Sequence, residues 1–157
     1  MSYQAEIRGL AQVEPYVHLD AGLIPLDVIS QALDWMEQAA PHELLAWIKA
    51  GSDYTIICPA QTATTCRCQP LDPFDQQGQN ALLDFNSHGL HKPFFSTVDN
   101  SDEKNSFRLF AVAGGFPTPT ILARVGIYGH FWNIPPEWVM DVPESVMTNY
   151  EGEPLWN

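Results

Sequence analysis

The segment that decides the fold lies in the middle of the chain, where residues 84–99 read DFNSHGLHKPFFSTVD. A strand-like apolar run leads there directly into a cluster of polar side chains. Side chains two positions apart on a strand point to the same face, so we expect Asp84, Asn86 and His88 to project together. Asp99 can return to the same place after the intervening loop. This grouping suits a metal site, but a His and an Asp eleven positions apart are by themselves a weak signal.

Outward from this segment, hydrophobic periodicity predicts one clear helix and several strands. The helix covers about residues 27–39, with Pro25 just before it and Pro41 after it. The predicted strands are residues 44–49, 54–58, 62–68, 81–87, 107–113 and 120–128. Several are continuously apolar, as strands buried on both faces are. We therefore expect an α/β fold, a mixed central β-sheet flanked by helices, with further helical turns at residues 100–105 and 135–146.

Length and composition favour one folded domain over residues 1–157. The chain is 45% hydrophobic and only 17% charged, which favours a packed core over disorder. We place the core at about residues 25–130 and an acidic, aromatic segment at 131–157, which either packs on the core edge or docks a basic partner. The start lacks a basic and apolar leader, and no long apolar run follows, so we expect a cytoplasmic protein.

The charge balance bears on partners. Nineteen acidic residues against seven basic ones give a formal net charge of −12. Such a chain repels nucleic-acid phosphates and anionic lipid surfaces, so we expect no nucleic-acid partner and no membrane partner. The three cysteines, Cys58, Cys66 and Cys68, cannot all pair within one chain, and we expect them to be reduced thiols.

The spacing within residues 84–99 resembles the motif of the JAB/MPN metalloprotease family, also called JAMM or Mov34/MPN/PAD-1. That motif is a His-x-His followed after ten residues by Asp, with a Ser three positions before the Asp. His88, Ser96 and Asp99 fall on the second His, the Ser and the Asp without a gap. The flanking residues are most similar to the bacterial branch that includes PRTRC system protein A. The resemblance covers about residues 25–130 and implies the JAB/MPN fold, a cytidine-deaminase-like α/β sandwich.

The resemblance also implies a chemistry. It implies a zinc ion held by His88, Asp99 and the residue at position 86, with Glu43 as the general base for a metal-activated water. Ser96 would stabilise the developing oxyanion. The implied reaction is hydrolysis of an amide or isopeptide bond in a protein or peptide substrate, with ubiquitin-like tails as the implied class.

The sequence departs from the family at Asn86, which stands where the motif has its first His. A neutral amide oxygen is not among the usual zinc ligands, so zinc affinity should fall. Asp84 on the same strand face or His91 in the adjacent loop could complete the ligand set. Three functions therefore stay open, namely a zinc-dependent peptidase, a catalytically inactive binding or scaffold module, and a non-catalytic metal sensor or store.

Overall fold

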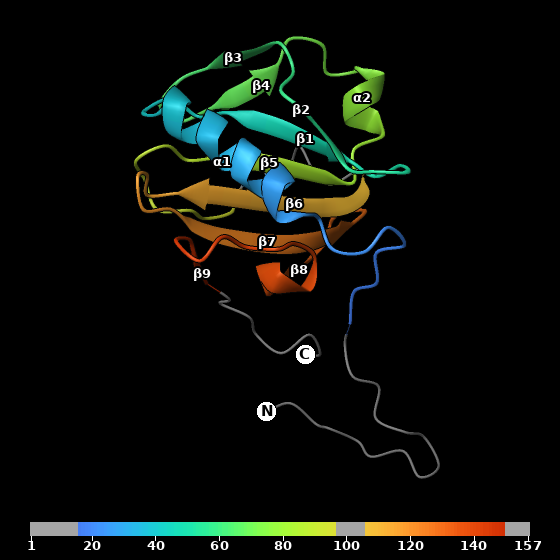
Figure 1. Ribbon diagram of the computed structural model, residues 1–157. Helices are drawn as coiled ribbons and strands as arrows, with labels where there is room; N and C mark the ends of the chain where they lie inside the picture. Colours follow the sequence, from blue (N-terminus) through green and yellow to red (C-terminus); the bar gives the residue numbers. More distant parts are fainter. Residues whose placement is uncertain (1–15, 97–105, 150–157) are drawn as a thin grey trace, which may run out of the picture.

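The computed structural model describes residues 16–96 and 106–149 and contains a central β-sheet with a long helix lying across it (Figure 1). Helix α1 is Leu26–Ala39. The strands of the sheet are β1 (Leu45–Lys49), β2 (Thr55–Ile57), β5 (Leu83–Ser87), β6 (Phe107–Gly114), β7 (Thr120–Ile127), β8 (His130–Ile134) and β9 (Met147–Thr148). The remaining elements are the hairpin strands β3 (Gln61–Ala63) and β4 (Cys68–Pro70), the short helix α2 (Gln76–Gln79) and the 3-10 turn η1 (Pro136–Trp138).

The sheet is mixed, as the sequence predicts. Its order is β2-β1-β5-β6-β7-β8, and β9 lies beside β7 as well. β5 pairs with β6 in parallel and β7 with β9 in parallel, whereas the other pairs are antiparallel. The parallel β5–β6 pair requires a long crossover, and the chain between them carries the second half of the motif-like segment.

Alternation along β1 and β5 separates two packing layers. Ala46 and Ile48 on β1 belong to the main core cluster, together with Leu83 and Phe85 on β5 and the buried stripe of α1. The alternate β1 residues Leu45 and Trp47 face the other side, where they form a smaller cluster that Cys68 of β4 packs against. Helix α1 thus covers one face of the sheet, and the β3–β4 hairpin covers part of the opposite face.

The hairpin corrects one sequence prediction, a continuous strand over residues 62–68. The chain turns instead between β3 and β4, and the turn is held by Thr64, whose backbone N–H donates to Arg67 O at 2.8 Å. The Thr64 hydroxyl also accepts from Cys66 N at 3.3 Å. A threonine side chain that hydrogen-bonds the nearby backbone in this way competes with strand pairing, so the strand does not continue through Thr64.

The C-terminal part of the described chain joins the sheet. Tyr128 and Gly129 both have positive φ angles, of 46° and 92°, and form the tight turn from β7 into β8. In residues 135–146 the one helical turn is η1, because the prolines there cannot donate backbone hydrogen bonds, and Met140 forms a parallel bridge with Ile24. Ile134, Val139 and Met140 are buried in the main core. The predicted turn at 100–105 lies outside the described residues. Within the described residues, no helix is long and apolar enough to span a membrane.

Candidate functional site

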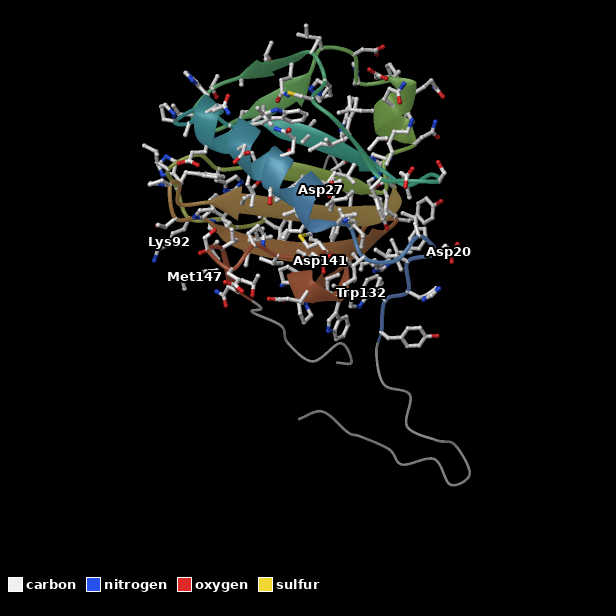
Figure 2. All side chains as sticks on the ribbon, in the orientation of Figure 1. Asp20, Asp27, Lys92, Trp132, Asp141 and Met147 are labelled. Carbon is white, nitrogen blue, oxygen red and sulfur yellow. The ribbon has the colours of Figure 1, made fainter. Side chains whose placement is uncertain are left out.

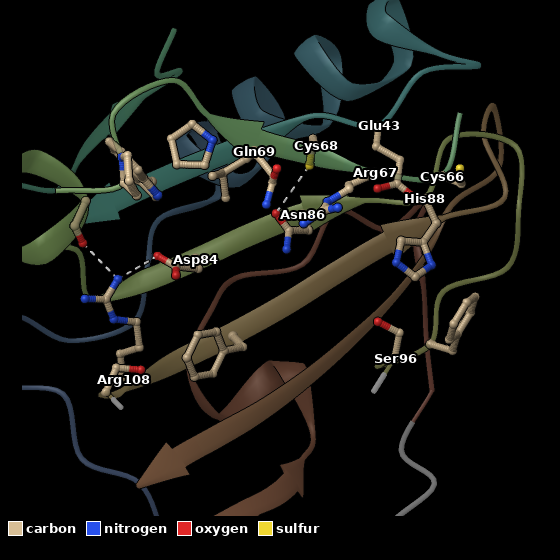
Figure 3. A pocket seen from close by; sticks show the side chains of 18 of the residues that line it. Glu43, Cys66, Arg67, Cys68, Gln69, Asp84, Asn86, His88, Ser96 and Arg108 are labelled. Carbon is tan, nitrogen blue, oxygen red and sulfur yellow. Dashed lines mark hydrogen bonds and ion pairs between the residues drawn. The ribbon is translucent and has the colours of Figure 1, made fainter. Parts of the chain in front are cut away.

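A cavity of about 1000 Å³ opens on the sheet face opposite α1 (Figure 3). Strands β1, β5 and β6 form its floor, and the β3–β4 hairpin, α2 and the chain after β5 form its walls. The alternation of β5 directs Asp84, Asn86 and His88 into this cavity, as the sequence predicts. Glu43, Ser96 and His91 line the same cavity. The structure therefore brings together the predicted site residues that it describes.

Glu43 and His88 are held near one another by the β1–β5 pairing. Leu45 pairs with Asn86 in antiparallel register, and continuing this register by two residues places Glu43 opposite His88. Ser87, which is fully buried, fixes the junction, because its Oγ accepts from Leu44 N at 2.8 Å and its N–H donates to Leu44 O at 2.9 Å. A residue 45 positions upstream of His88 thus reaches the same end of the cavity.

The chain after β5 turns back over the cavity. The backbone N–H of His91 donates to His88 O at 2.9 Å, closing a turn around Gly89. Phe94 then packs its ring edge-on against the His88 ring, with 4.6 Å between ring centroids. These contacts bring Ser96, which is half-buried, to the cavity wall. Asp99, the third predicted metal residue, lies outside the described residues.

Asn86 is engaged by the hairpin. The thiol of Cys68 donates to Asn86 Oδ1 over 3.8 Å, a contact drawn in Figure 3. The atom that would have to bind a metal therefore already accepts a hydrogen bond. Among residues 16–96 and 106–149, no three His, Cys, Asp or Glu side chains gather closely enough to hold a metal ion. His88, His91 and Glu43 line the cavity beside the Asn86 amide, which is a poor zinc ligand, but these described donors do not gather closely enough to form a zinc site.

Asp84 lies at the other end of the cavity and has a different partner. Its carboxylate accepts from Arg108 Nη1 at 2.9 Å, and the same guanidinium donates to the backbone oxygens of Gly78 at 2.8 Å and Gln79 at 3.0 Å. Burial raises the pKa of Asp84 from 3.8 to about 6, while the charge and hydrogen bond of Arg108 act against this rise. Asp84 therefore anchors α2 to the sheet through Arg108 and is not placed to supplement Asn86 as a ligand.

Sequence reasoning missed the basic and aromatic residues of the cavity. Arg108 comes from β6 and Trp47 from β1, while Arg67 and Lys92 come from the hairpin turn and from the chain after β5. Arg108 stands two residues before Phe110 on β6, so the two side chains share a face of the sheet, and both line the cavity. No local signal indicates Arg67, because its place depends on a turn that the pattern hid.

Comparisons with known proteins give no family for this chain. No known family profile matches the chain, and no curated protein matches it. Among solved structures, the chain is similar to the solution structure of protein DSY2949 from Desulfitobacterium hafniense, with a TM-score of 0.48 and 14% sequence identity. The match covers 76% of this chain and 91% of that one.

Proposed function

We propose that this chain is a JAB/MPN-like module that binds a polypeptide tail in the cavity beside β5 and does not hydrolyse it. The observation that carries the proposal is the state of Asn86, an amide at the motif's first His position whose oxygen accepts the Cys68 thiol hydrogen bond. A large cavity rimmed by exposed apolar side chains such as Phe94 suits an extended polypeptide.

One arrangement favours a second candidate, the hydrolysis of an amide or isopeptide bond. Glu43 and His88 lie at the same end of the cavity, and Ser96 lines this cavity as well (Figure 3). In such a site Glu43 would take a proton from the attacking water, and the Ser96 hydroxyl would donate to the developing oxyanion. We rank it second because Asn86 offers an amide oxygen where this candidate needs an imidazole.

Zinc content separates the two candidates. The native protein is equilibrated with zinc, dialysed and analysed for metal beside Asn86→His. We expect well under one zinc per chain in the native protein and a clear gain in Asn86→His, because an imidazole is a far stronger zinc donor than an amide. Binding is measured separately, with fluorescently labelled ubiquitin-like proteins that carry a free C-terminal tail.

Cleavage is the second readout. A ubiquitin-like protein fused through its tail to a reporter is incubated with the native protein and with Glu43→Gln, which keeps the side-chain shape but removes the basic carboxylate. We expect no cleavage by either. Stoichiometric zinc in the native protein, together with cleavage that Glu43→Gln abolishes, would overturn the binding-module proposal and establish the peptidase.

A further inference from the structure

Two basic side chains that line the cavity have no partner among the described residues. Within residues 16–96 and 106–149, neither the Arg67 guanidinium nor the Lys92 ammonium forms a hydrogen bond or an ion pair, and both residues are exposed. Arg67 comes from the hairpin turn, and Figure 3 shows it beside Asn86. Lys92 comes from the chain after β5, so the two cations approach the cavity from different elements.

The other basic residues of the described chain are engaged. Lys49 Nζ donates to Gln77 Oε1 at 2.6 Å, away from the cavity lining. Arg108 is bound to Asp84 and to α2. The Arg124 guanidinium is buried against aromatic rings. Arg67 and Lys92 are thus the described bases left open to a ligand.

These cations stand out against the charge of the whole chain. The net charge is −12, and acidic side chains such as Asp20, Asp27 and Asp141 project into solvent elsewhere on the surface (Figure 2). Only two described carboxylates line the cavity, Glu43 and Asp84, and Asp84 is neutralised by Arg108. The chain has many acids and few bases, yet the described residues provide no partner for these two cations at the cavity. Charge complementarity in this cavity therefore favours a negatively charged ligand.

We infer that the polypeptide bound in this cavity is an acidic segment, whose carboxylates pair with Arg67 and Lys92. The inference rests on the proposed function and names its ligand class. Arg67 can take a carboxylate through two parallel N–H donors, and Lys92 through a single ammonium. Leu90 and Phe94, which flank Lys92 and are 59% and 54% exposed, offer apolar contacts to intervening side chains.

A nucleic acid is the weaker ligand on the same observations. Nucleic-acid affinity grows with the number of phosphates that are neutralised, and two cations neutralise few. The surrounding charge of −12 opposes a long polyanion much more than a short peptide, whose contacts stay within the cavity.

The test uses three short fluorescent peptides with the same length and the same Leu and Gly residues. Their polar positions are all Glu, all Gln or all Lys, and binding is measured by fluorescence anisotropy at one fixed ionic strength. We expect the Glu peptide to bind most tightly. The double variant Arg67→Gln/Lys92→Gln should weaken Glu-peptide binding about fivefold, the size expected for two exposed ion pairs, while leaving Gln-peptide binding unchanged. Lys49→Gln is the control, because it removes one positive charge from a residue that does not line the cavity. It should leave the affinities for the Glu and Gln peptides unchanged.

The outcomes separate the inference from the proposed function. Equal binding of the Glu and Gln peptides, or an equal loss in Lys49→Gln, would overturn the acidic preference and leave peptide binding standing. Failure of all three peptides to bind would overturn both. Tighter binding of a single-stranded oligothymidylate than of the Glu peptide, lost in the double variant, would reassign the cations to nucleic acid.

Discussion

The Cys68 thiol on β4 donates to Asn86 Oδ1 on β5 over 3.8 Å, and this contact ties the β3–β4 hairpin to the centre of the sheet. It joins residues 18 positions apart across the cavity wall. Asn86 therefore has a structural partner in the fold at the position where the resembling motif places a metal ligand. A side chain occupied in this way contributes to the shape of the cavity whether or not a metal binds.

Removing the Cys68 thiol should loosen the hairpin modestly. Cys68→Ala deletes a weak hydrogen bond and a half-buried contact with the Trp47 cluster, so we expect a loss of about 1 kcal/mol in the free energy of unfolding. Cys66→Ala is the matched control, since Cys66 is an exposed thiol in the same hairpin whose sulfur lies 3.7 Å from Thr64 Oγ1, a weak exposed contact, and it should change stability by less than about 0.5 kcal/mol. Urea unfolding measures both. Equal effects would show that the Asn86 contact contributes nothing particular.

The approach of Gly89 to Pro41 brings together the segments that carry His88 and Glu43. A Cβ on Gly89 would lie 2.5 Å from Pro41 O, and the Gly89 φ angle is +53°. Gly89→Ala should therefore cost the strain of a left-handed backbone, about 1 kcal/mol, and a further 1–3 kcal/mol for the displaced Pro41 segment. Peptide binding should fall as well, because the end of the cavity shifts.

Gly22→Ala separates these two costs. Gly22 also has a positive φ, of +80°, but no atom lies within 4 Å of the added Cβ. This variant should lose only the backbone term and keep its peptide affinity. If denaturant unfolding shows the two alanine variants equally stable, close packing between Gly89 and Pro41 is not what holds this end of the cavity.

The sequence predicts the features that depend on residues close together in the chain, and it does not predict those that depend on residues far apart in the chain. Helix α1 and strands β1, β5, β6 and β7 were predicted within about two residues, because periodic apolar residues report their own burial. The common face of Asp84, Asn86 and His88 followed from alternation alone. The Asp84–Arg108 pair joins residues 24 positions apart, and only the parallel β5–β6 pairing places them together. No local pattern contains that pairing.

Three misses have local causes. The sequence predicts strand across the hairpin turn because Thr64, Cys66 and Cys68 alternate as strand residues do, whereas the Thr64 side chain stabilises the turn. Strand β8 was missed although Tyr128-Gly129 precedes it, because a tyrosine at positive φ is an uncommon turn residue. Helix α2 has only four residues and is held by the Asp75 cap and Arg108, so it has no periodic signal.

Asp84 should make stability depend on pH in a defined direction. Its folded-state pKa of about 6 lies above the ordinary value of 3.8, so the folded protein binds an extra proton between these values and loses stability as pH rises from about 4 to about 6. A full shift would amount to about 3 kcal/mol, but 22% of the side chain is exposed, so we expect a smaller change. Above pH 6 to 7 this contribution should be flat.

Asp84→Asn isolates the effect, since it keeps the shape and cannot ionise. The stability of the native protein relative to Asp84→Asn should decline between pH 4 and 6, as measured by urea unfolding at several pH values. Asp27→Asn, at an exposed position on α1, is the matched control for the replacement of an aspartate by asparagine. A difference between native and Asp84→Asn that does not vary with pH would mean that Asp84 ionises in the folded protein as it does in the unfolded chain.

Arg124 should fix the segment that carries Ser96 by packing between aromatic rings. Its guanidinium carbon lies 4.0 Å from the Phe95 ring centroid and 4.1 Å from that of Phe131, and the residue is only 3% exposed. A double-mutant cycle of Arg124→Met with Phe95→Leu should give a coupling free energy of about 1 kcal/mol, because a desolvated cation over an aromatic face is stabilising. The same cycle with Phe74→Leu, at a residue that is 80% exposed, should give almost none. Because Phe95 adjoins Ser96, loss of this contact should also weaken peptide binding at the cavity wall, and a coupling near zero would mean that other contacts hold Ser96 in place.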